Sequence, residues 1–363
     1  MKNLHDLKNK IEKSSISFSD IIRKFSEEYR QNLSKTALSL FLNKGIEPKK
    51  IEDFSEKIET ILKKLINKED IMEKCEILSR EAVKQFKLSR DPFVPIYTNE
   101  KEILMLQAHY DALENMRITA ELGLMTAITG EVGSGKSTVR IKFKSIMRNS
   151  GRCIIIQPDT QEINRITSRE ILEAILRKLS DEKPKRNLES LTNQVKNTLI
   201  NMKNQGVKCI LMLEEAQDLH THTLKRLKRL WEMRDENDEI ISLITIIMIG
   251  QPELAYRLYG SQNTNLREVA SRVTHVELGA INYELYEYFQ HKFKIAGANI
   301  EKIITRDAVE ELSKKFTAKD VNGKISYKAY PNKMNNVMKK LLNTATASGE
   351  EIINKDVVEM AGI

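Results

Sequence analysis

The chain of 363 residues has few aromatic side chains, few cysteines and no long apolar run. Aromatic residues make up 6% of it, with one Trp, and Cys75, Cys153 and Cys209 lack the paired spacing of a zinc site or a disulfide framework. No apolar stretch approaches the roughly 20 residues that a membrane-spanning helix needs. Residues 1–13 are rich in charge and lack the apolar centre of a signal peptide. We therefore expect a cytoplasmic protein with no membrane association.

The composition that remains is that of a folded, basic protein. Hydrophobic residues make up 40% and charged residues 30%, enough apolar surface for packed cores. The 59 Lys and Arg residues outnumber the 51 Asp and Glu residues, so the net charge is +8, and the basic excess is larger in residues 1–90 than in the rest. A basic excess at one end favours a polyanionic partner such as nucleic acid.

The pattern along the chain changes from helical to alternating strands and helices and back to helical. We predict a helical domain at residues 1–67, a charged helical linker at 68–90, a core at 91–280 and a helical domain at 281–363. Strand–helix alternation in the core predicts an α/β fold with a parallel sheet. The predicted strands are residues 124–129, 153–157, 209–213, 243–249 and 273–278.

The N-terminal domain reads as short helices joined by tight turns, which favours a helix-turn-helix unit that binds DNA. Ser34 is a good N-cap, and the helix after it ends at Asn43, Lys44 and Gly45. On this interpretation that helix enters the major groove. A helical protein-interaction module is the alternative. The residues predicted to face outward, toward DNA, are Lys35, Thr36, Ser39, Asn43 and Lys44.

The strongest motif is GEVGSGKST, which matches the phosphate-binding pattern GxxxxGK[ST]. A predicted strand precedes it and a predicted helix follows it, so glycine-rich backbone and a helix N-terminus would surround the phosphates. Lys136 would neutralise the β- and γ-phosphates of ATP, and Ser137 would offer a hydroxyl to Mg²⁺. The predicted nucleotide-binding residues are Gly130, Glu131, Val132, Gly133, Ser134, Gly135, Lys136, Ser137 and Thr138.

Two carboxylates end the predicted strand 209–213. Glu214 would hold Mg²⁺, and Glu215 would polarise the attacking water as the catalytic base. The first of these positions is usually Asp in ATPases with this phosphate loop, and Glu214 is one methylene longer. The alternative is that both are ordinary solvated acids at the end of a strand.

Other polar residues follow the later strands. Gln251, after the strand 243–249, would sense the γ-phosphate and position water. Arg267 and Arg272 precede the last strand, where an arginine can reach a neighbouring subunit's γ-phosphate and spread the transition-state charge. We favour Arg272 for this role. A surface ion pair is the alternative.

Together, residues 130–138, 213–217, 249–254 and 267–274 resemble an AAA+ ATPase of the group that contains ExeA, TniB and the Mu phage B protein. The run Gly-Gln-Pro-Glu-Leu at 250–254 is the most specific element, and the resemblance covers about residues 88–345. It implies a five-stranded AAA+ core, a C-terminal helical lid, and rings or helical filaments with ATP between subunits. The lid of this group normally supplies a sensor arginine. Here Asn332 stands in its place, and Lys333 is the candidate substitute.

Two functions of this group compete. One is an ATP-dependent DNA-binding ATPase that assembles on double-stranded DNA and selects or delivers target DNA to a transposase. The other is secretion-system assembly of the ExeA type, whose members add a membrane span and a peptidoglycan-binding region that this sequence does not show. We favour transposition, with ATP hydrolysis stimulated by DNA or a partner.

A third interpretation is a DNA-binding regulator that uses ATP only as an assembly switch, which the glutamate at position 214 keeps open. In any of the DNA-binding readings, part of the contact with the duplex would come from the core. The candidate DNA-binding residues there are Arg165, Arg169, Lys225, Arg226, Lys228 and Arg229.

Overall fold

The computed structural model divides into two compact units, Met1–Ile77 and Leu78–Ile363. In the second unit it describes residues 78–94, 103–158, 166–233, 241–260, 264–281, 283–319 and 325–363. In the first it describes residues 76–77, residues 35–44 and separate positions between 21 and 61.

The first unit contains the helix that was predicted after Ser34, which is α3 (Lys35–Lys44). Its side chains Leu38 and Phe41 are buried, and the Phe41 ring meets Phe54 edge-on at 5.0 Å. Thr36 is exposed, as predicted. The side chains of the other four proposed DNA contacts on this helix lie outside the described residues, as do residues 1–20 of the predicted helical domain. The helix-turn-helix assignment therefore stays a prediction.

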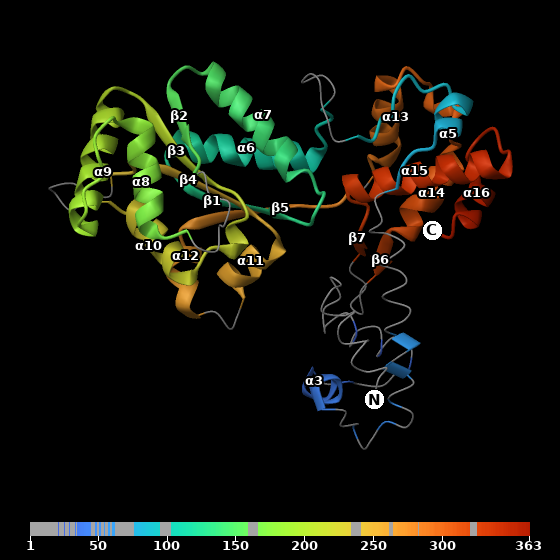
Figure 1. The fold of residues 1–363 in the computed structure, drawn as a ribbon, viewed down its shortest axis with the longest axis horizontal. Helices are drawn as coiled ribbons and strands as arrows, with labels where there is room; N and C mark the ends of the chain where they lie inside the picture. Colours follow the sequence, from blue (N-terminus) through green and yellow to red (C-terminus); the bar gives the residue numbers. More distant parts are fainter. Residues whose placement is uncertain are drawn as a thin grey trace. The chain divides into compact units, whose positions relative to one another are not determined.

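The second unit is built on a parallel five-stranded sheet in the order β2-β3-β4-β1-β5 (Figure 1). Each strand lies within two residues of its predicted bounds. The order brings the ends of β1 and β3 to either side of the end of β4, at the carboxyl edge of the sheet. The strands are β1 (Met125–Gly130), β2 (Cys153–Ile156), β3 (Lys208–Leu213), β4 (Thr245–Gly250) and β5 (Val273–Leu278).

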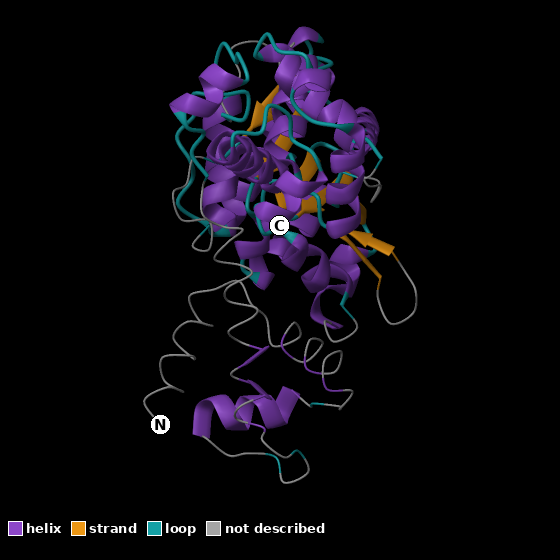
Figure 2. Ribbon diagram, turned by 90° about the vertical axis from the view of Figure 1, so that its right-hand side faces the viewer, coloured by secondary structure: helices purple, strands orange, loops and turns teal. Residues whose placement is uncertain are grey.

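Helices cover both faces of this sheet, so the orange strands lie between purple helices in Figure 2. In β3, Ile210 and Met212 pack against α6 (Gln107–Leu122) and α7 (Lys136–Asn149), whereas Leu211 and Leu213 face the opposite layer. Alternate residues of a strand point to opposite faces, so a strand covered on both sides is apolar throughout. The opposite layer consists of α8 (Ser168–Leu179), α9 (Leu188–Asn204), α10 (Thr221–Trp231), α11 (Pro252–Tyr259) and α12 (Arg267–Ala270).

Local signals in the sequence explain where these helices begin and end. Thr167 caps α8 and Glu170 bonds back to the Thr167 backbone, which is a capping box. Asn187 caps α9, and Gly123 ends α6 in the left-handed conformation at φ 67°. Two single-turn 3₁₀ helices, η3 (Ala216–Asp218) and η4 (Thr264–Leu266), connect the longer elements.

Residues 283–363 are mostly helical, as predicted, and we call them the C-terminal segment. They also contain a short antiparallel hairpin that the sequence did not predict, β6 (Thr317–Lys319) with β7 (Ile325–Tyr327). Strands of this length carry too few residues for a period-2 pattern to be recognised. The helices are α13 (Leu285–Ile295), α14 (Arg306–Lys315), α15 (Pro331–Ser348) and α16 (Lys355–Met360), with η5 (Ile300–Lys302) between the first two.

Part of the predicted linker packs against the C-terminal segment. The short helix α5 (Arg80–Gln85) lies beside α15, where the backbone N–H of Ser79 donates to Asn343 Oδ1 at 2.9 Å. Farther on, Asp91 pairs with the buried Lys339 at 3.3 Å. Residues 78–93 therefore belong to the second unit and are not a spacer that precedes it.

Candidate nucleotide site

The predicted phosphate loop connects β1 to α7, in the strand–loop–helix arrangement that its sequence predicts. β1 is buried along its whole length, so the loop starts from a fixed point. Gly133 and Gly135 take positive φ angles of 78° and 99°, which glycine adopts without strain. The loop then passes into the first turn of α7, whose N–H groups have no partner within the helix and can bind an anion.

Lys136 lies folded over the loop. Its Nζ donates to the carbonyl oxygens of Gly130 at 2.6 Å and Glu131 at 2.9 Å. Burial lowers the pKa of Lys136, while the carboxylates of Glu215, Glu131 and Glu253 act in the opposite direction. The ammonium is therefore held over the loop, and Glu215 is close enough to affect its pKa.

A buried histidine, which was not predicted from the sequence as a site residue, forms a hydrogen bond to the backbone of the phosphate loop. His109 on α6 accepts a hydrogen bond at Nδ1 from the Leu106 backbone N–H at 3.2 Å. Nδ1 therefore carries no proton, and Nε2–H donates to the Ser134 carbonyl at 2.9 Å. A Cβ on Gly135 would overlap this ring, so the loop can approach the histidine only with glycine there. Burial lowers the pKa of His109, which favours the neutral form that this arrangement needs.

The first turn of α15 contacts the tip of the phosphate loop. The backbone N–H of Asn332 donates to the Gly133 carbonyl at 3.3 Å, and a Cβ on Gly133 would overlap the Asn332 side chain. The Nζ of Lys333 lies 5.1 Å from the ring centre of Phe316, inside the C-terminal segment. Of the two residues, Asn332 is thus the one whose side chain meets the loop.

The first acidic residue after β3 belongs to a polar network. Arg140, on the helix that follows the loop, forms an ion pair with Glu214 Oε1, and Gln157 Nε2 donates to the same oxygen at 2.8 Å. Lys144 Nζ donates to Gln157 Oε1 at 2.5 Å. Glu214 Oε2 makes no such contact with any described residue. One carboxylate oxygen is therefore occupied, and the other is available to a metal-bound water.

The second acidic residue has an unusual backbone. Glu215 adopts φ 46° and ψ 40°, the left-handed region that non-glycine residues rarely occupy and that is enriched at functional sites. Its Oε2 accepts a hydrogen bond from Gln217 Nε2 at 2.8 Å. The backbone N–H of Gln251, at the end of β4, donates to Gln217 Oε1 at 2.9 Å. Gln217 thus connects two predicted site residues, although no role for it was predicted from the sequence.

The proposed arginine in trans is engaged within the subunit. Arg272 Nε pairs with Glu232 Oε1 at 3.1 Å, and its side chain is 47% exposed. Lys228 pairs with Glu232 at 3.3 Å and with Glu268 at 3.0 Å. Arg267 is exposed on α12. The structure therefore places Arg272 at the surface, in the ion pair that the sequence analysis named as the alternative.

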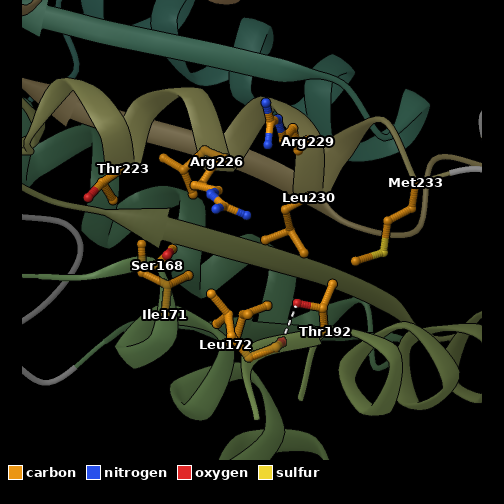
Figure 3. A pocket seen from close by; sticks show the side chains of 11 residues that line it. Ser168, Ile171, Leu172, Thr192, Thr223, Arg226, Arg229, Leu230 and Met233 are labelled. Carbon is orange, nitrogen blue, oxygen red and sulfur yellow. Dashed lines mark hydrogen bonds between the residues drawn. The ribbon is translucent and has the colours of Figure 1, made fainter. Parts of the chain in front are cut away.

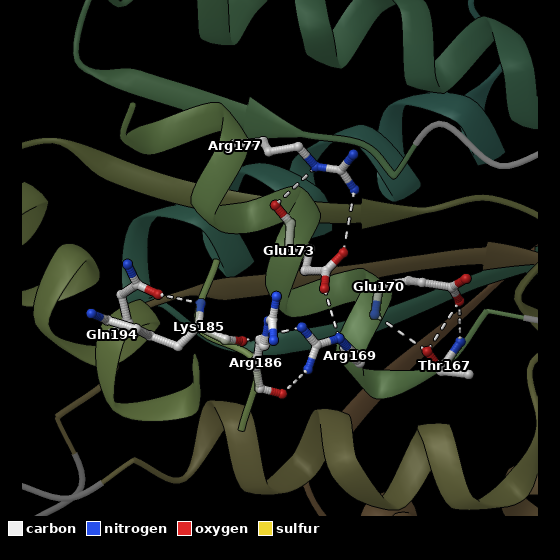
Figure 4. A network of polar contacts seen from close by, with 8 residues as sticks. All are labelled: Thr167, Arg169, Glu170, Glu173, Arg177, Lys185, Arg186 and Gln194. Atoms are coloured by element: carbon white, nitrogen blue, oxygen red, sulfur yellow. Dashed lines mark hydrogen bonds and ion pairs between the residues drawn. The ribbon is translucent and has the colours of Figure 1, made fainter. Parts of the chain in front are cut away.

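The predicted DNA contacts of the core differ in their surroundings. Lys225 and Arg229 are exposed on α10, whereas Arg226 is half-buried and points toward a cavity of about 110 Å³ (Figure 3). Arg169 pairs with Glu173 at 2.7 Å and donates to the carbonyls of Arg186 and Lys185 (Figure 4). Arg165 lies outside the described residues. The cavity lies between α8, α9 and α10, and its lining is mostly apolar, with Ile171, Leu172, Leu188, Leu227, Leu230 and Met233.

The cysteines that the structure describes are inert by environment. Burial raises the pKa of Cys153 to about 11 and that of Cys209 to about 12. Neither thiol therefore ionises near neutral pH. Cys75 lies outside the described residues. Within the described ranges no helix is long and apolar enough to cross a membrane.

Comparison with protein families supports the nucleotide-binding fold that the parallel sheet and the phosphate loop indicate. Residues 120–258, fewer than half of the chain, match the family described as "AAA domain". This match covers β1, the phosphate loop, both acidic residues after β3 and Gln251. The chain therefore contains an α/β AAA-type nucleotide-binding domain. Comparison with curated proteins gives no significant match.

Several solved structures are similar to the chain at low identity. Cdc6p from Pyrobaculum aerophilum has 15% identity and a TM-score of 0.46, over 74% of this chain and 69% of that one. The ORC2 protein of Aeropyrum pernix has 16% identity and a TM-score of 0.46, over 75% and 71%. RuvB from Thermotoga maritima, a Holliday junction branch migration motor, has 14% identity and a TM-score of 0.39, over 72% and 69%.

Proposed function

We propose that this protein is an AAA+ ATPase that binds double-stranded DNA in an ATP-dependent way and delivers target DNA to a transposase. The observation that carries the ATPase part is the phosphate loop after β1, with Glu215 near Lys136 at the same sheet edge. A cation neutralises the phosphates, and a carboxylate accepts a proton from the attacking water, so both groups serve phosphoryl transfer to water.

The residues divide the chemistry between them. The loop N–H groups and Lys136 bind and orient the phosphates, and Glu215 accepts a proton from the attacking water. Gln251 orients that water. Mg²⁺, when bound, neutralises charge on the β- and γ-phosphates. Ser137, in the first turn of α7, and Glu214, through its uncommitted oxygen, would hold it. Hydroxyl and carboxylate oxygens are the donors that Mg²⁺ prefers, so these residues fit the ion.

DNA binding rests on charge and on the exposed basic residues. Lys225 and Arg229 are exposed on α10. In the N-terminal unit, the exposed Thr36 lies on α3, the helix that we assign to the DNA major groove. One subunit offers few phosphate contacts, so assembly into a ring or filament would multiply them along the duplex. In such an assembly Arg272 would exchange Glu232 for the neighbour's nucleotide.

Two other functions follow from specific observations. The ion pair between Arg140 and Glu214 favours a regulator that binds ATP as an assembly switch and turns it over slowly, because this carboxylate is partly neutralised. The motifs shared with ExeA keep a secretion-assembly role as a further alternative. The adjacent gene discriminates among them: a transposase gene supports our proposal, and secretion genes contradict it.

The experiment that tests the ATPase assignment compares nucleotide binding with turnover. Lys136→Ala should lose binding of a fluorescent ATP analogue. Glu215→Gln should bind it normally but hydrolyse ATP about 100-fold more slowly, the low end for removal of a general base. The exposed Lys178→Ala and Glu189→Gln are matched controls on α8 and α9. If Glu215→Gln hydrolyses ATP at the wild-type rate, another residue is the base.

A further inference from the structure

Gln217 lies between the ends of β3 and β4, in the single-turn helix η3. Both the oxygen and the nitrogen of its side-chain amide form hydrogen bonds. Oε1 accepts from the Gln251 backbone N–H at 2.9 Å, and Nε2 donates to Glu215 Oε2 at 2.8 Å. The side chain therefore forms a bridge from the proposed base to the backbone of the proposed sensor.

The orientation of this amide is fixed by its partners. A backbone N–H can only donate, so the oxygen of Gln217 must face Gln251. The NH₂ group then faces Glu215, where it also lies 3.3 Å from Asp218 Oδ2. Carboxylate oxygens accept hydrogen bonds, so each contact matches a donor with an acceptor. The amide of Gln217 therefore accepts from Gln251 and donates to Glu215.

The surrounding backbone is shaped to admit this side chain. A Cβ on Gly250 would lie 2.8 Å from Gln217 Oε1, so any larger residue there would push the amide away. On the other side, Arg257 of α11 donates to the Gln217 backbone carbonyl. Glu215 itself is in the left-handed conformation, so the strand ladder of β3 no longer directs its side chain. In this conformation the Glu215 carboxylate accepts the hydrogen bond from Gln217.

We propose that Gln217 is a positioning residue that holds the Glu215 carboxylate at the nucleotide and couples its place to the end of β4. This inference rests on the proposed ATPase function. Gln217 takes no part in the chemistry itself. It fixes one oxygen of the base, and through Gln251 it makes the positions of base and sensor depend on each other.

Gln217→Glu is the sharpest test, because it keeps the shape and the acceptor for Gln251 but replaces the donor by a carboxylate oxygen. A second carboxylate beside Glu215 disfavours the ionised base. We expect kcat to fall about 10- to 100-fold, KM to change less than twofold, and the acidic limb of the pH–rate profile to move about one unit upward. Gln217→Met, without either polar end, should lower kcat similarly with a smaller shift of that limb.

The matched control is Gln194, which makes the same pair of contacts away from the site. Its Oε1 accepts from the Lys185 backbone N–H at 3.1 Å (Figure 4). Its Nε2 donates to Glu182 at 2.7 Å. Gln194→Glu should leave kcat and the pH profile unchanged. Hydrogen exchange of the Gln251 amide gives a readout without turnover: Gln217→Met should speed it, and Gln217→Glu should leave it protected.

The outcomes separate the two claims. A wild-type protein that hydrolyses no ATP overturns the proposed function, and the positioning role with it. If the wild type hydrolyses ATP but Gln217→Glu and Gln217→Met keep the wild-type kcat and pH profile, the positioning role is wrong and the ATPase assignment stands. A loss of kcat equal to that of Gln194→Glu, with lowered thermal stability in both, would show a structural effect and also overturn the inference.

Discussion

His109 should contribute to stability as well as to the shape of the phosphate loop. In His109→Ala, the Ser134 carbonyl and the Leu106 N–H lose their partner in a site where His109 is only 3% exposed. A buried polar group without a hydrogen bond costs about 1–3 kcal/mol. With two such groups and some relaxation, we expect the free energy of unfolding to fall by about 2–4 kcal/mol. Urea denaturation measures this loss, with the exposed His222→Ala as control.

The pH dependence gives the same residue a second, more specific signature. Burial lowers the folded-state pKa of His109 below its usual value of 6.5, so at acid pH the unfolded chain binds the proton first. Its stabilising contribution is complete above the unfolded pKa and is lost as the pH falls through the folded pKa. His109→Gln keeps an N–H donor but does not titrate. The stability of the wild type relative to His109→Gln should therefore decrease from pH 7.5 to pH 5.

The slope of that decrease has an upper limit of about 1.4 kcal/mol per pH unit, the value for one proton. His275 on β5, whose pKa burial also lowers, titrates in both proteins and cancels in the comparison. A difference between wild type and His109→Gln that stays constant across this range would refute the neutral, buried state of His109. A loss below about 0.5 kcal/mol for His109→Ala would refute the hydrogen-bond argument itself.

Three other predictions concern the metal, assembly and DNA. Arg140→Ala removes the ion pair to Glu214, so Mg²⁺ should strengthen nucleotide binding more in this variant than in wild type. Nucleotide titrations with Mg²⁺ and with EDTA measure this, and an equal effect of Mg²⁺ in both proteins contradicts the prediction. Arg272→Ala mixed with Lys136→Ala should regain ATPase activity if Arg272 acts in trans, and no recovery in confirmed mixed assemblies contradicts it. A protein lacking residues 1–77 should keep ATP-dependent DNA binding, measured by anisotropy, with a smaller salt slope, about −0.9 per lost phosphate contact. If the shortened protein loses all DNA binding but still hydrolyses ATP, the N-terminal unit alone binds DNA and the core does not.

The sheet and the loop could be predicted from the sequence because their signals are local. The strands β1 and β4, which are buried along their whole length, appear in the sequence as mostly apolar runs. The edge strand β5 is partly exposed, and its bounds at residues 273–278 were also predicted to the residue. The phosphate loop carries its glycines, lysine and serine within nine consecutive positions. Glu214 and Glu215 stand out because charged residues directly follow a buried strand.

The partners of these residues could not be predicted, because they come from distant parts of the chain. His109 lies 25 residues from Ser134, Gln157 lies 57 from Glu214, and Arg140 lies 74 from Glu214. Each is an ordinary polar residue in its own helix or strand end, and only the sheet order brings it to the site. For Arg169 the opposite holds, because its partners are close to it in the chain. Its charge suggested DNA, but three of its contacts lie within the α8–α9 region.

Because the first turn of α15 contacts Gly133, a movement of the phosphate loop would be transmitted to this helix. Its 18 residues span about 27 Å at 1.5 Å per residue, from the phosphate loop to α5 and α16. A packed helix moves as a rigid body, because its side chains are fixed between its neighbours. A change at the loop of the size that phosphate binding or release produces would therefore tilt α15. The displacement would reach Asn343 and, through it, Ser79, where the second unit of the chain begins.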